Sequence, residues 1–289
     1  MLKIFIPSWR RPATTTTPAL LDACGIDYKL VIRETEYAEY LKNFNKKKLL
    51  VIGAEDGLNL AREYTRSLLK KNEWCLHMDD NVLGFIQCEK KFYHAHDVVP
   101  LDDGEDMVTR AKWQPTMNHK VSFKEFYDLV VSDTVFKCVQ RGAYLAGFSA
   151  HDNPAFRYRK FTDVGYVCGK TMLMCNQGLP WVQSYESSGE DYALTAAHLY
   201  ENGRVLINKW GHPMRKHYMA GGCGPYDERL SAMMRAQQDL CLRYGDLFAI
   251  KNEGKEDKRQ GELRLRFNSL EQVAKWRADL PHDPNWRMK

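Results

Sequence analysis

The sequence predicts an α/β fold, in which helices flank a mixed β-sheet. One observation behind this prediction is that short β-rich runs alternate with helical patterns through the first 80 residues. The other is the composition. The 289 residues are 44% hydrophobic and 27% charged, which is typical of a globular protein with a sizeable core.

Four strands and three helices are expected in this first part of the chain. The strands are LKIFI (2–6), YKLVI (28–32), KLLVIG (48–53) and WCLHM (74–78), and the helices between them are PALLDAC (18–24), EYAEYLKNF (36–44) and LNLAREYTRSLLKK (58–71). Strands separated in this way pair in parallel through right-handed crossovers. Ligands bind beyond the carboxyl ends of such strands, where Asp79, Asp80 and Asn81 follow the fourth strand.

The remainder of the chain predicts further strands and helices around an irregular insertion. Residues 87–120 lack a clear period, so we expect an insertion there that borders the site. A helix is expected over 123–142, ending at Gly142, with Phe126, Leu129, Val130, Val135 and Phe136 at near-helical spacing. Later strands are expected at 143–149, 164–169, 204–210 and 262–267, and later helices at 187–203, 226–245 and 269–280.

Cysteine use and apolar runs limit the class of protein. The eight cysteines contain no C-x-x-C pair, which argues against a disulfide framework or a cysteine zinc site. No stretch approaches the about 18 apolar residues of a membrane span, and the apolar run at the start is too short for a signal peptide. We therefore expect a soluble, cytoplasmic protein. The net charge of +5 favours a polyanionic partner without establishing one.

Two acidic pairs supply candidate chemistry. Asp79, Asp80 and Asn81 offer the hard oxygen ligands that Mg²⁺ or Mn²⁺ prefers, although a solvated turn or helix cap would use the same residues. Glu190 and Asp191 open a predicted helix, where they either complement the helix dipole or provide a general base.

Basic and glycine-rich segments supply candidate binding groups. PSWRRP (7–12) puts Pro7, Ser8, Arg10 and Arg11 in a stiff loop suited to a nucleotide diphosphate, and Arg62 points toward the same edge. GHPMRKHYMAGGCG (211–224) offers His212 or His217 to a metal, and Gly221 and Gly222 to close ligand approach. FRYRKF (156–161) resembles a surface that contacts nucleic acid through Arg157, Arg159 and Lys160, or else one ordinary strand face.

Taken in order, these segments resemble a GT-A glycosyltransferase. More narrowly, IFIPSWRRP, GLNLARE, WCLHMDDN, GYVCGK, GEDYAL, GRVLINKW and HPMRKHYMAGGCG are similar to the bacteriophage TET-associated glycosyltransferases, which decorate hydroxymethylated pyrimidines in DNA. The resemblance covers roughly residues 2–225. It implies a GT-A domain over 1–225, with the insertion at 87–120, and a helical, basic extension over 226–289 packed on the same domain.

The resemblance also implies roles for individual residues. A D-x-D motif on Asp79, Asp80 and Asn81 would hold Mn²⁺ or Mg²⁺ with a nucleotide-diphosphate sugar, expected to be a UDP-sugar; Asn81 departs from the usual third Asp. Arg10 or Arg11 and Arg62 would contact the nucleotide. Asp191, with Glu190 beside it, corresponds to the base of inverting members, and His212 or His217 to a late metal ligand.

The implied acceptor is a 5-hydroxymethylpyrimidine, or a sugar already attached to one, in double-stranded phage DNA within the host cytoplasm, with no membrane partner. Three other readings stay open. The enzyme could glycosylate a glycan or small molecule, or the chain could be a sugar-phosphate nucleotidyltransferase, although the Gly-rich signature of that class is absent. A noncatalytic DNA-binding module would leave both acidic pairs unexplained.

Overall fold

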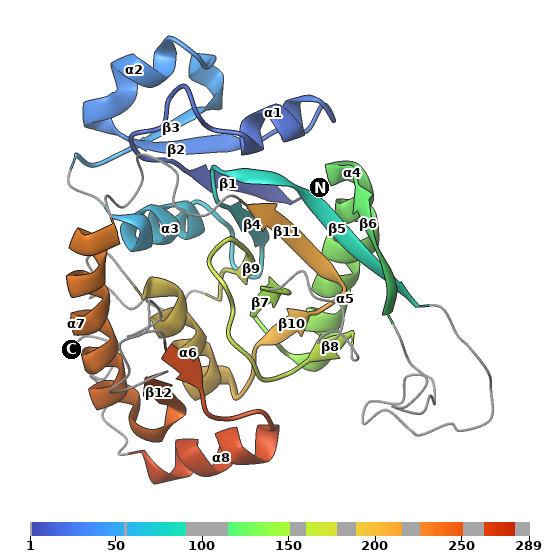
Figure 1. Cartoon of the computed structure of the whole chain (residues 1–289), viewed down its shortest axis with the longest axis vertical. Coiled ribbons are helices and arrows are strands. Elements are labelled where there is room, and N and C mark those ends of the chain that lie inside the picture. Colours follow the sequence, from blue (N-terminus) through green and yellow to red (C-terminus); the bar gives the residue numbers. More distant parts are fainter. Residues whose placement is uncertain are drawn as a thin grey trace.

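A computed structural model describes residues 2–54, 57–90, 115–150, 160–177, 189–215, 226–250 and 263–280. The fold is a mixed α/β fold with helices around a large sheet (Figure 1). This sheet has eight strands in the order β3-β2-β1-β4-β9-β7-β10-β8, and smaller sheets are formed by β11-β5-β6 and β12-β13.

The first four strands of the main sheet are parallel, as the alternating sequence pattern predicts. The reason is that each run of three central residues is buried in β1 and β2, and each crossover contains a helix. The other half of the sheet mixes directions, because β9 is antiparallel to both β4 and β7. The strands are β1 Lys3–Pro7, β2 Lys29–Arg33, β3 Leu49–Ile52, β4 Trp74–Met78, β7 Leu145–Phe148, β8 Phe161–Thr162, β9 Thr171–Cys175 and β10 Leu206–Asn208.

The helices cover the main sheet or link its strands. The α-helices are α1 Thr17–Asp22, α2 Tyr37–Leu41, α3 Leu58–Ser67, α4 Phe123–Phe126, α5 Ser132–Arg141, α6 Glu190–Asn202, α7 Tyr226–Tyr244 and α8 Leu270–Asp279. Short 3₁₀ turns occupy Glu34–Glu36, Lys46–Lys48 and Gly245–Leu247. Helix α6 begins after Gly189 and ends before Gly203, both in the left-handed conformation, as expected from the glycine positions.

The expectation that residues 87–120 form an irregular insertion is wrong at both ends of that range. β5 runs over Val82–Lys90 and pairs with β6, Pro115–Val121, in an antiparallel hairpin. The central part, 91–114, lies outside the described residues. β11, Gly211–Arg215, pairs with the other edge of β5 and completes a second sheet that begins directly after the acidic segment 79–81.

Two other expectations differ from the structure, and two strands are found that the sequence does not predict. Residues 164–169 form a loop instead of a strand, and the strand in this region is β9. β11 and β12, Phe248–Ile250, are strands that the sequence pattern does not predict, and β12 pairs with β13, Leu263–Leu265, which lies within the expected strand at 262–267. Within the helix at 123–141, Leu129 and Phe136 are 53% and 64% exposed, whereas Phe126 and Val130 are buried.

A π-helical turn at Tyr127–Val131 explains this last difference. It adds one residue to a turn and so rotates the residues after it relative to a regular helix. The same stretch packs closely against the start of β11. A side chain at Gly211 would place its Cβ 2.4 Å from Val130 Cγ1 and 3.0 Å from Phe126 Cε2, so only glycine fits there.

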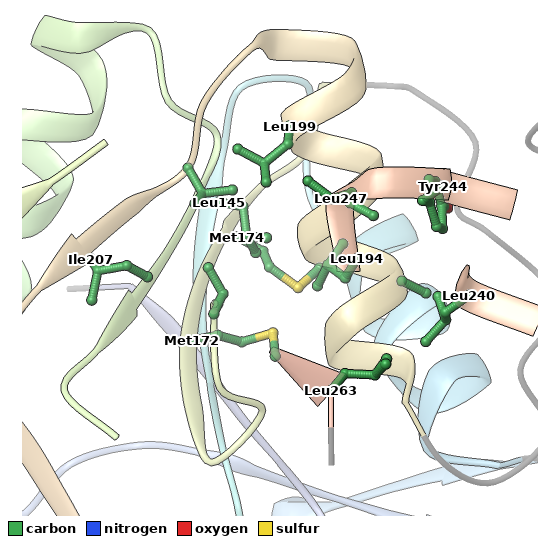
Figure 2. Close-up of a cluster of buried hydrophobic side chains, with 14 of the residues drawn as sticks. Leu145, Met172, Met174, Leu194, Leu199, Ile207, Leu240, Tyr244, Leu247 and Leu263 are labelled. Carbon is green, nitrogen blue, oxygen red and sulfur yellow. The ribbon is translucent and has the colours of Figure 1, made fainter. Parts of the chain in front are cut away.

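The C-terminal helices share one core with the main sheet. Leu240 and Tyr244 of α7, and Leu247 after it, join a buried cluster with Met172 and Met174 of β9 (Figure 2). Trp276 of α8 belongs to the same cluster, and its indole N–H donates to the carbonyl of Tyr244 at 2.9 Å. In the described residues, no helix combines the length and apolar character needed to cross a bilayer.

The shared core predicts a contrast between two leucines of α7. Leu240 is 0% exposed and Leu242 is 84% exposed, so Leu240→Ala removes packed atoms and leaves a cavity, whereas Leu242→Ala does neither. Urea unfolding of the full chain should show a loss of about 2–5 kcal/mol for Leu240→Ala and under about 0.5 kcal/mol for Leu242→Ala. Equal losses would show that α7 is not packed as described.

Candidate active site

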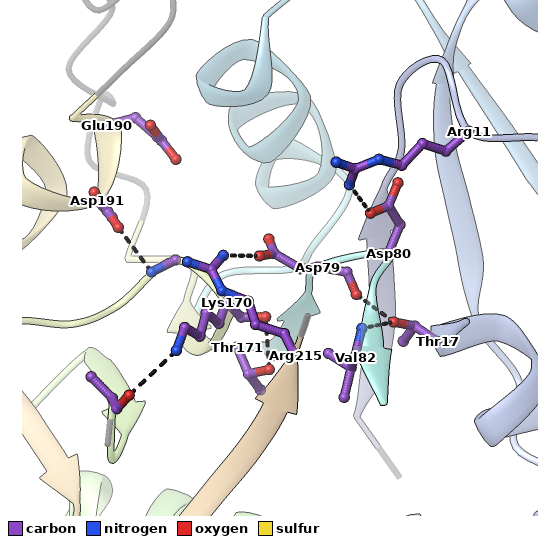
Figure 3. A network of polar contacts seen from close by, with 12 residues as sticks. Arg11, Thr17, Asp79, Asp80, Val82, Lys170, Thr171, Glu190, Asp191 and Arg215 are labelled. Carbon is purple, nitrogen blue, oxygen red and sulfur yellow. Dashed lines mark hydrogen bonds and ion pairs between the residues drawn. The ribbon is translucent and has the colours of Figure 1, made fainter. Parts of the chain in front are cut away.

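The candidate site lies at the carboxyl end of β4, where the sequence predicts it. Asp79, Asp80 and Asn81 follow this strand, and the residues around them come from segments far apart in the sequence (Figure 3). The backbone at this point is held firmly. The N–H of Asp79 donates to the carbonyl of Lys170 at 2.7 Å, and the carbonyl of Asp80 accepts from the N–H groups of Thr16 and Thr17.

Asp80 is a buried, fully engaged carboxylate. It is 4% exposed; Arg11 Nη1 donates to Oδ1 at 2.8 Å, and the hydroxyl of Ser8 donates to Oδ2 at 2.7 Å. Burial raises the pKa of Asp80, while Arg11 and Ser8 act in the opposite direction. Because both oxygens have partners, Asp80 fixes the loop after β1 to the end of β4.

The loop after β1 carries the predicted donor-binding residues. Pro7 ends the strand, and the hydroxyls of Ser8 and Tyr40 share a hydrogen bond of 2.7 Å. Arg10 adopts a φ of 56°, an unusual conformation for a residue other than glycine, and its N–H donates to Glu36. Trp9 lies under the guanidinium of Arg10 and of Arg33, at 4.7 and 3.8 Å from the ring centroid.

Asp79 differs from Asp80 in its partners and exposure. Arg215, the last residue of β11, donates from Nη1 to Asp79 Oδ2 at 2.8 Å, and the side chain of Asp79 is 23% exposed. Among the described residues, no hydrogen bond reaches its other oxygen, Oδ1. Asp79 therefore offers a carboxylate oxygen to a ligand, and Asp80 does not.

Arg62 is a buried cation instead of an exposed nucleotide contact. It is 1% exposed; Nη1 donates to Glu190 Oε1 and Nη2 to the carbonyl of Gly169, both at 2.9 Å. The expectation that Arg62 binds the donor directly is thus not supported by its position. The contacts make Arg62 a positioning residue that joins α3 to the start of α6.

Glu190 and Asp191 have different surroundings although they are adjacent. Burial, and next the charge of Asp191, raise the pKa of Glu190 to about 7 against the opposing effect of Arg62. Asp79 also acts in this direction, because it lies within electrostatic range. The side chain of Glu190 keeps 13% exposure, and its Oε1 alone is bound to Arg62.

Three hydrogen bonds hold the carboxylate of Asp191. The buried hydroxyl of Tyr166 and the N–H of Gly169 donate to Oδ2, and the N–H of Tyr192 donates to Oδ1. The rings of Tyr166 and Tyr192 stack with centroids 4.1 Å apart, which fixes the donor. Burial, and next the charge of Asp191, raise the pKa of Tyr166, so its hydroxyl stays protonated and donates.

A divalent ion fits Asp79 better than Asp80, Asn81 or His212, the other described residues that the sequence assigns to the metal. The described residues contain no ready group of three His, Cys, Asp or Glu, but Mg²⁺ is usually held by one or two carboxylates together with substrate phosphates. Asp79 has an oxygen for this purpose. Asp80 has none, and Asn81 is 7% exposed. His212 is 6% exposed, and its Nδ1 donates to the carbonyl of Ser149 at 2.8 Å.

The acceptor-side residues are mostly outside the described structure. His217, Arg157, Arg159, Gly221 and Gly222 all lie there. Lys160 is described, and its Nζ lies 2.6 Å from Asp133 Oδ2 and 5.0 Å from the centroid of the Trp210 ring. This lysine is therefore occupied within the protein and is not a free contact for DNA phosphate.

The sequence reasoning missed Tyr166, Gly169, Lys170 and Arg215. Tyr166, Gly169 and Lys170 belong to GYVCGK, which was expected to form a strand and instead forms the loop that joins Arg62 to Asp191. Arg215 lies in the noted segment 211–224, but its partner is 136 residues away in the chain. No local signal in the sequence links the two.

Comparisons with known proteins do not show a family. No protein-family model matches the chain, and no curated protein matches it significantly. Among solved structures, it is similar to mannose-6-phosphate isomerase from Helicobacter pylori, with 9% identity and a TM-score of 0.29 over 98% of this chain and 91% of that one. A TM-score this low carries no argument about fold or function.

The raised pKa of Glu190 predicts a pH-dependent effect of Glu190→Gln on stability. Between pH 4.5 and about 7 the carboxyl ionises in the unfolded chain before it does so in the folded chain, so the wild type loses stability as pH rises. Glutamine does not titrate. The free energy of unfolding of the variant, relative to wild type, should therefore increase by on the order of 2–3 kcal/mol from pH 4.5 to pH 8, measured by urea unfolding.

Glu73→Gln is the control for this measurement. Hydrogen bonds from the Lys70 N–H and then from Lys3 lower the pKa of this exposed carboxyl, so its variant should show the opposite, smaller trend with pH. A Glu190→Gln difference that stays constant across the range would contradict the described environment of Glu190.

Proposed function

We propose that the chain is a glycosyltransferase of the GT-A type that uses a nucleotide-diphosphate sugar. The observation that carries this proposal is the convergence of two acidic pairs and several arginines at one sheet edge. Asp79 and Asp80 come from the end of β4, Glu190 and Asp191 from the start of α6, and their arginine partners from the loop after β1, from α3 and from β11 (Figure 3). Their order along the chain is that of the resemblance drawn from the sequence.

The donor would lie along the loop after β1. Trp9 would offer an aromatic face to a base, expected to be uracil, when one of the guanidinium groups of Arg10 and Arg33 over its ring moves aside. Tyr40 and Ser8 hold this loop in place through hydrogen bonds that end on Asp80. A loop fixed in this way loses little conformational entropy when it binds a nucleotide.

Asp79 is the residue proposed to hold Mn²⁺ or Mg²⁺, together with the donor phosphates. When bound, the ion would neutralise the negative charge that grows on the leaving diphosphate. Arginines of the chain would supply further positive charge beside the leaving group. Arg11 and Arg215 lie at the same edge and supply fixed positive charge, which stabilises an anionic leaving group most strongly where water is excluded.

The two acids of α6 are proposed to have different tasks. A general base must reach the proton of the acceptor hydroxyl and works best when its pKa lies near the working pH. Glu190, with a pKa of about 7, meets the second condition, whereas Asp191 is held by three donors. We therefore propose that Glu190 accepts the proton of the acceptor hydroxyl and that Asp191 has a positioning role. This reverses the assignment implied by the resemblance.

The acceptor is proposed to be a hydroxymethylated pyrimidine in double-stranded DNA, on the strength of the sequence resemblance and the net charge of +5. A glycan or small-molecule acceptor is the second candidate. The observation in its favour is that Lys160, one of the three expected DNA contacts, is paired with Asp133. Both candidates use the same donor site, so one experiment can separate them.

Nucleoside mass spectrometry tests the reaction. The protein, Mn²⁺ and a panel of sugar nucleotides are incubated with hydroxymethylated duplex DNA, unmodified duplex DNA and simple sugars. A hexose or pentose mass should appear on the hydroxymethylated base, and Asp79→Asn should lower product at least about 100-fold through weaker charge neutralisation. Product on sugars alone would replace the DNA acceptor by a glycan. Absence of product and of donor binding would remove the glycosyltransferase proposal.

A pair of variants tests the division of work within α6. Glu190→Gln should lower kcat by about 10²–10⁴-fold with donor affinity nearly unchanged, because it removes the proton acceptor. Asp191→Asn should lower kcat by less than about tenfold, since the amide oxygen can still accept from Tyr166 and Gly169. The reverse order of effects would restore Asp191 as the base.

A further inference from the structure

Arg215 and Asp79 form an ion pair between two sheets. Arg215 ends β11 in the second sheet, Asp79 follows β4 of the main sheet, and their closest atoms are 2.8 Å apart. Both side chains remain partly accessible, at 28% and 23%. The pair therefore lies where a ligand can reach it, in contrast to the pair of Arg11 with Asp80, which is 13% and 5% accessible.

Each member of this ion pair has unused bonding capacity. The Nε of Arg215 is buried and donates to nothing among the described residues. The Oδ1 of Asp79 accepts no hydrogen bond from them. A buried donor without an acceptor is unfavourable, so the Nε of Arg215 would gain from an acceptor that a ligand supplies.

We propose that Arg215 binds the diphosphate of the donor. Until the donor and a divalent ion bind together, Arg215 stays in its ion pair with Asp79. This inference rests on the proposed function. A planar guanidinium can bind phosphate through two N–H groups at once, which gives the unsatisfied Nε an acceptor. Asp79 is released by the same movement and turns to the ion.

The exchange couples the two ligands. If the ion binds Asp79 in the absence of a diphosphate, the partly buried Arg215 loses its negatively charged partner. If a diphosphate binds Arg215 in the absence of the ion, Asp79 loses its positively charged partner. Breaking one side of such a pair is costly because an uncompensated charge remains. When both ligands bind, each charged side chain keeps a partner of opposite sign. Ion and diphosphate should therefore each strengthen the binding of the other, by reciprocal linkage.

Calorimetry on the full chain tests the exchange, with Mn²⁺ and inorganic pyrophosphate as probes, each alone and then together. Arg215→Gln should bind Mn²⁺ alone about 3–10-fold more tightly than wild type, because Asp79 is free, and should bind pyrophosphate with Mn²⁺ at least about tenfold more weakly. Asp79→Asn should show the opposite pattern: weaker Mn²⁺ binding and about 3–10-fold tighter pyrophosphate binding without the ion. Arg215→Lys should keep part of the pyrophosphate affinity.

Arg266→Gln is the matched control, since Arg266 forms an ion pair of 3.0 Å with Asp246 on the exposed surface. It should leave unchanged the affinities for Mn²⁺ and for pyrophosphate, measured alone and together. Gains in one ligand and losses in the other cannot result from misfolding, which lowers both. The inference is overturned if Arg215→Gln weakens or leaves unchanged the binding of Mn²⁺ alone while wild type binds both probes. If wild type binds neither probe, the proposed donor site fails as well.

Discussion

Compensation of buried charge is the constraint on which the candidate site depends. Arg62 is almost completely enclosed, and its positive charge is tolerable only because Glu190 and the carbonyl of Gly169 surround it. These contacts join α3 to the loop before β9 and to α6, both of which lie more than 100 residues later in the chain. The N–H of Gly169 also donates to Asp191, so both acids of α6 are oriented through one short loop.

Gly169 shows how little space this arrangement leaves. A Cβ at this position would lie 2.9 Å from Arg62 Nη2 and 3.2 Å from Asp191 Oδ2. Any other residue at this position would require Arg62 or Asp191 to shift from its described place. On the other side of the site, Asp80 has the corresponding role, because it ties the loop after β1 to β4 through Arg11 and Ser8. The pairs of Arg62 and of Asp80 thus lie on the two sides of the site. Asp79 and Glu190 lie between them, and each has one carboxylate oxygen bound to an arginine.

The sequence predicts the half of the fold in which the local alternation of strands and helices matches the order in which the strands pair. β1 to β4 are recognisable because their apolar runs alternate with helices, and Asp79 and Asp80 follow the carboxyl end of β4 as expected. β9 and β11 are not recognisable in this way. β9 follows a loop, 164–169, whose apolar residues themselves resemble a strand, and β11 contains Pro213 at a position where a strand is not expected. The roles of Arg62 and Arg215 depend on partners far along the chain, which local spacing does not reveal.

The close packing at Gly211 has a consequence for evolution and engineering of the chain. Gly211 begins β11 against the π-helical turn, and Arg215 ends the same strand at the site. Any side chain at 211 must displace the strand, and the displacement is carried four residues along to the guanidinium. In a library of variants, changes at position 211 would therefore alter ligand affinity, although Gly211 lies at the opposite end of β11 from Arg215.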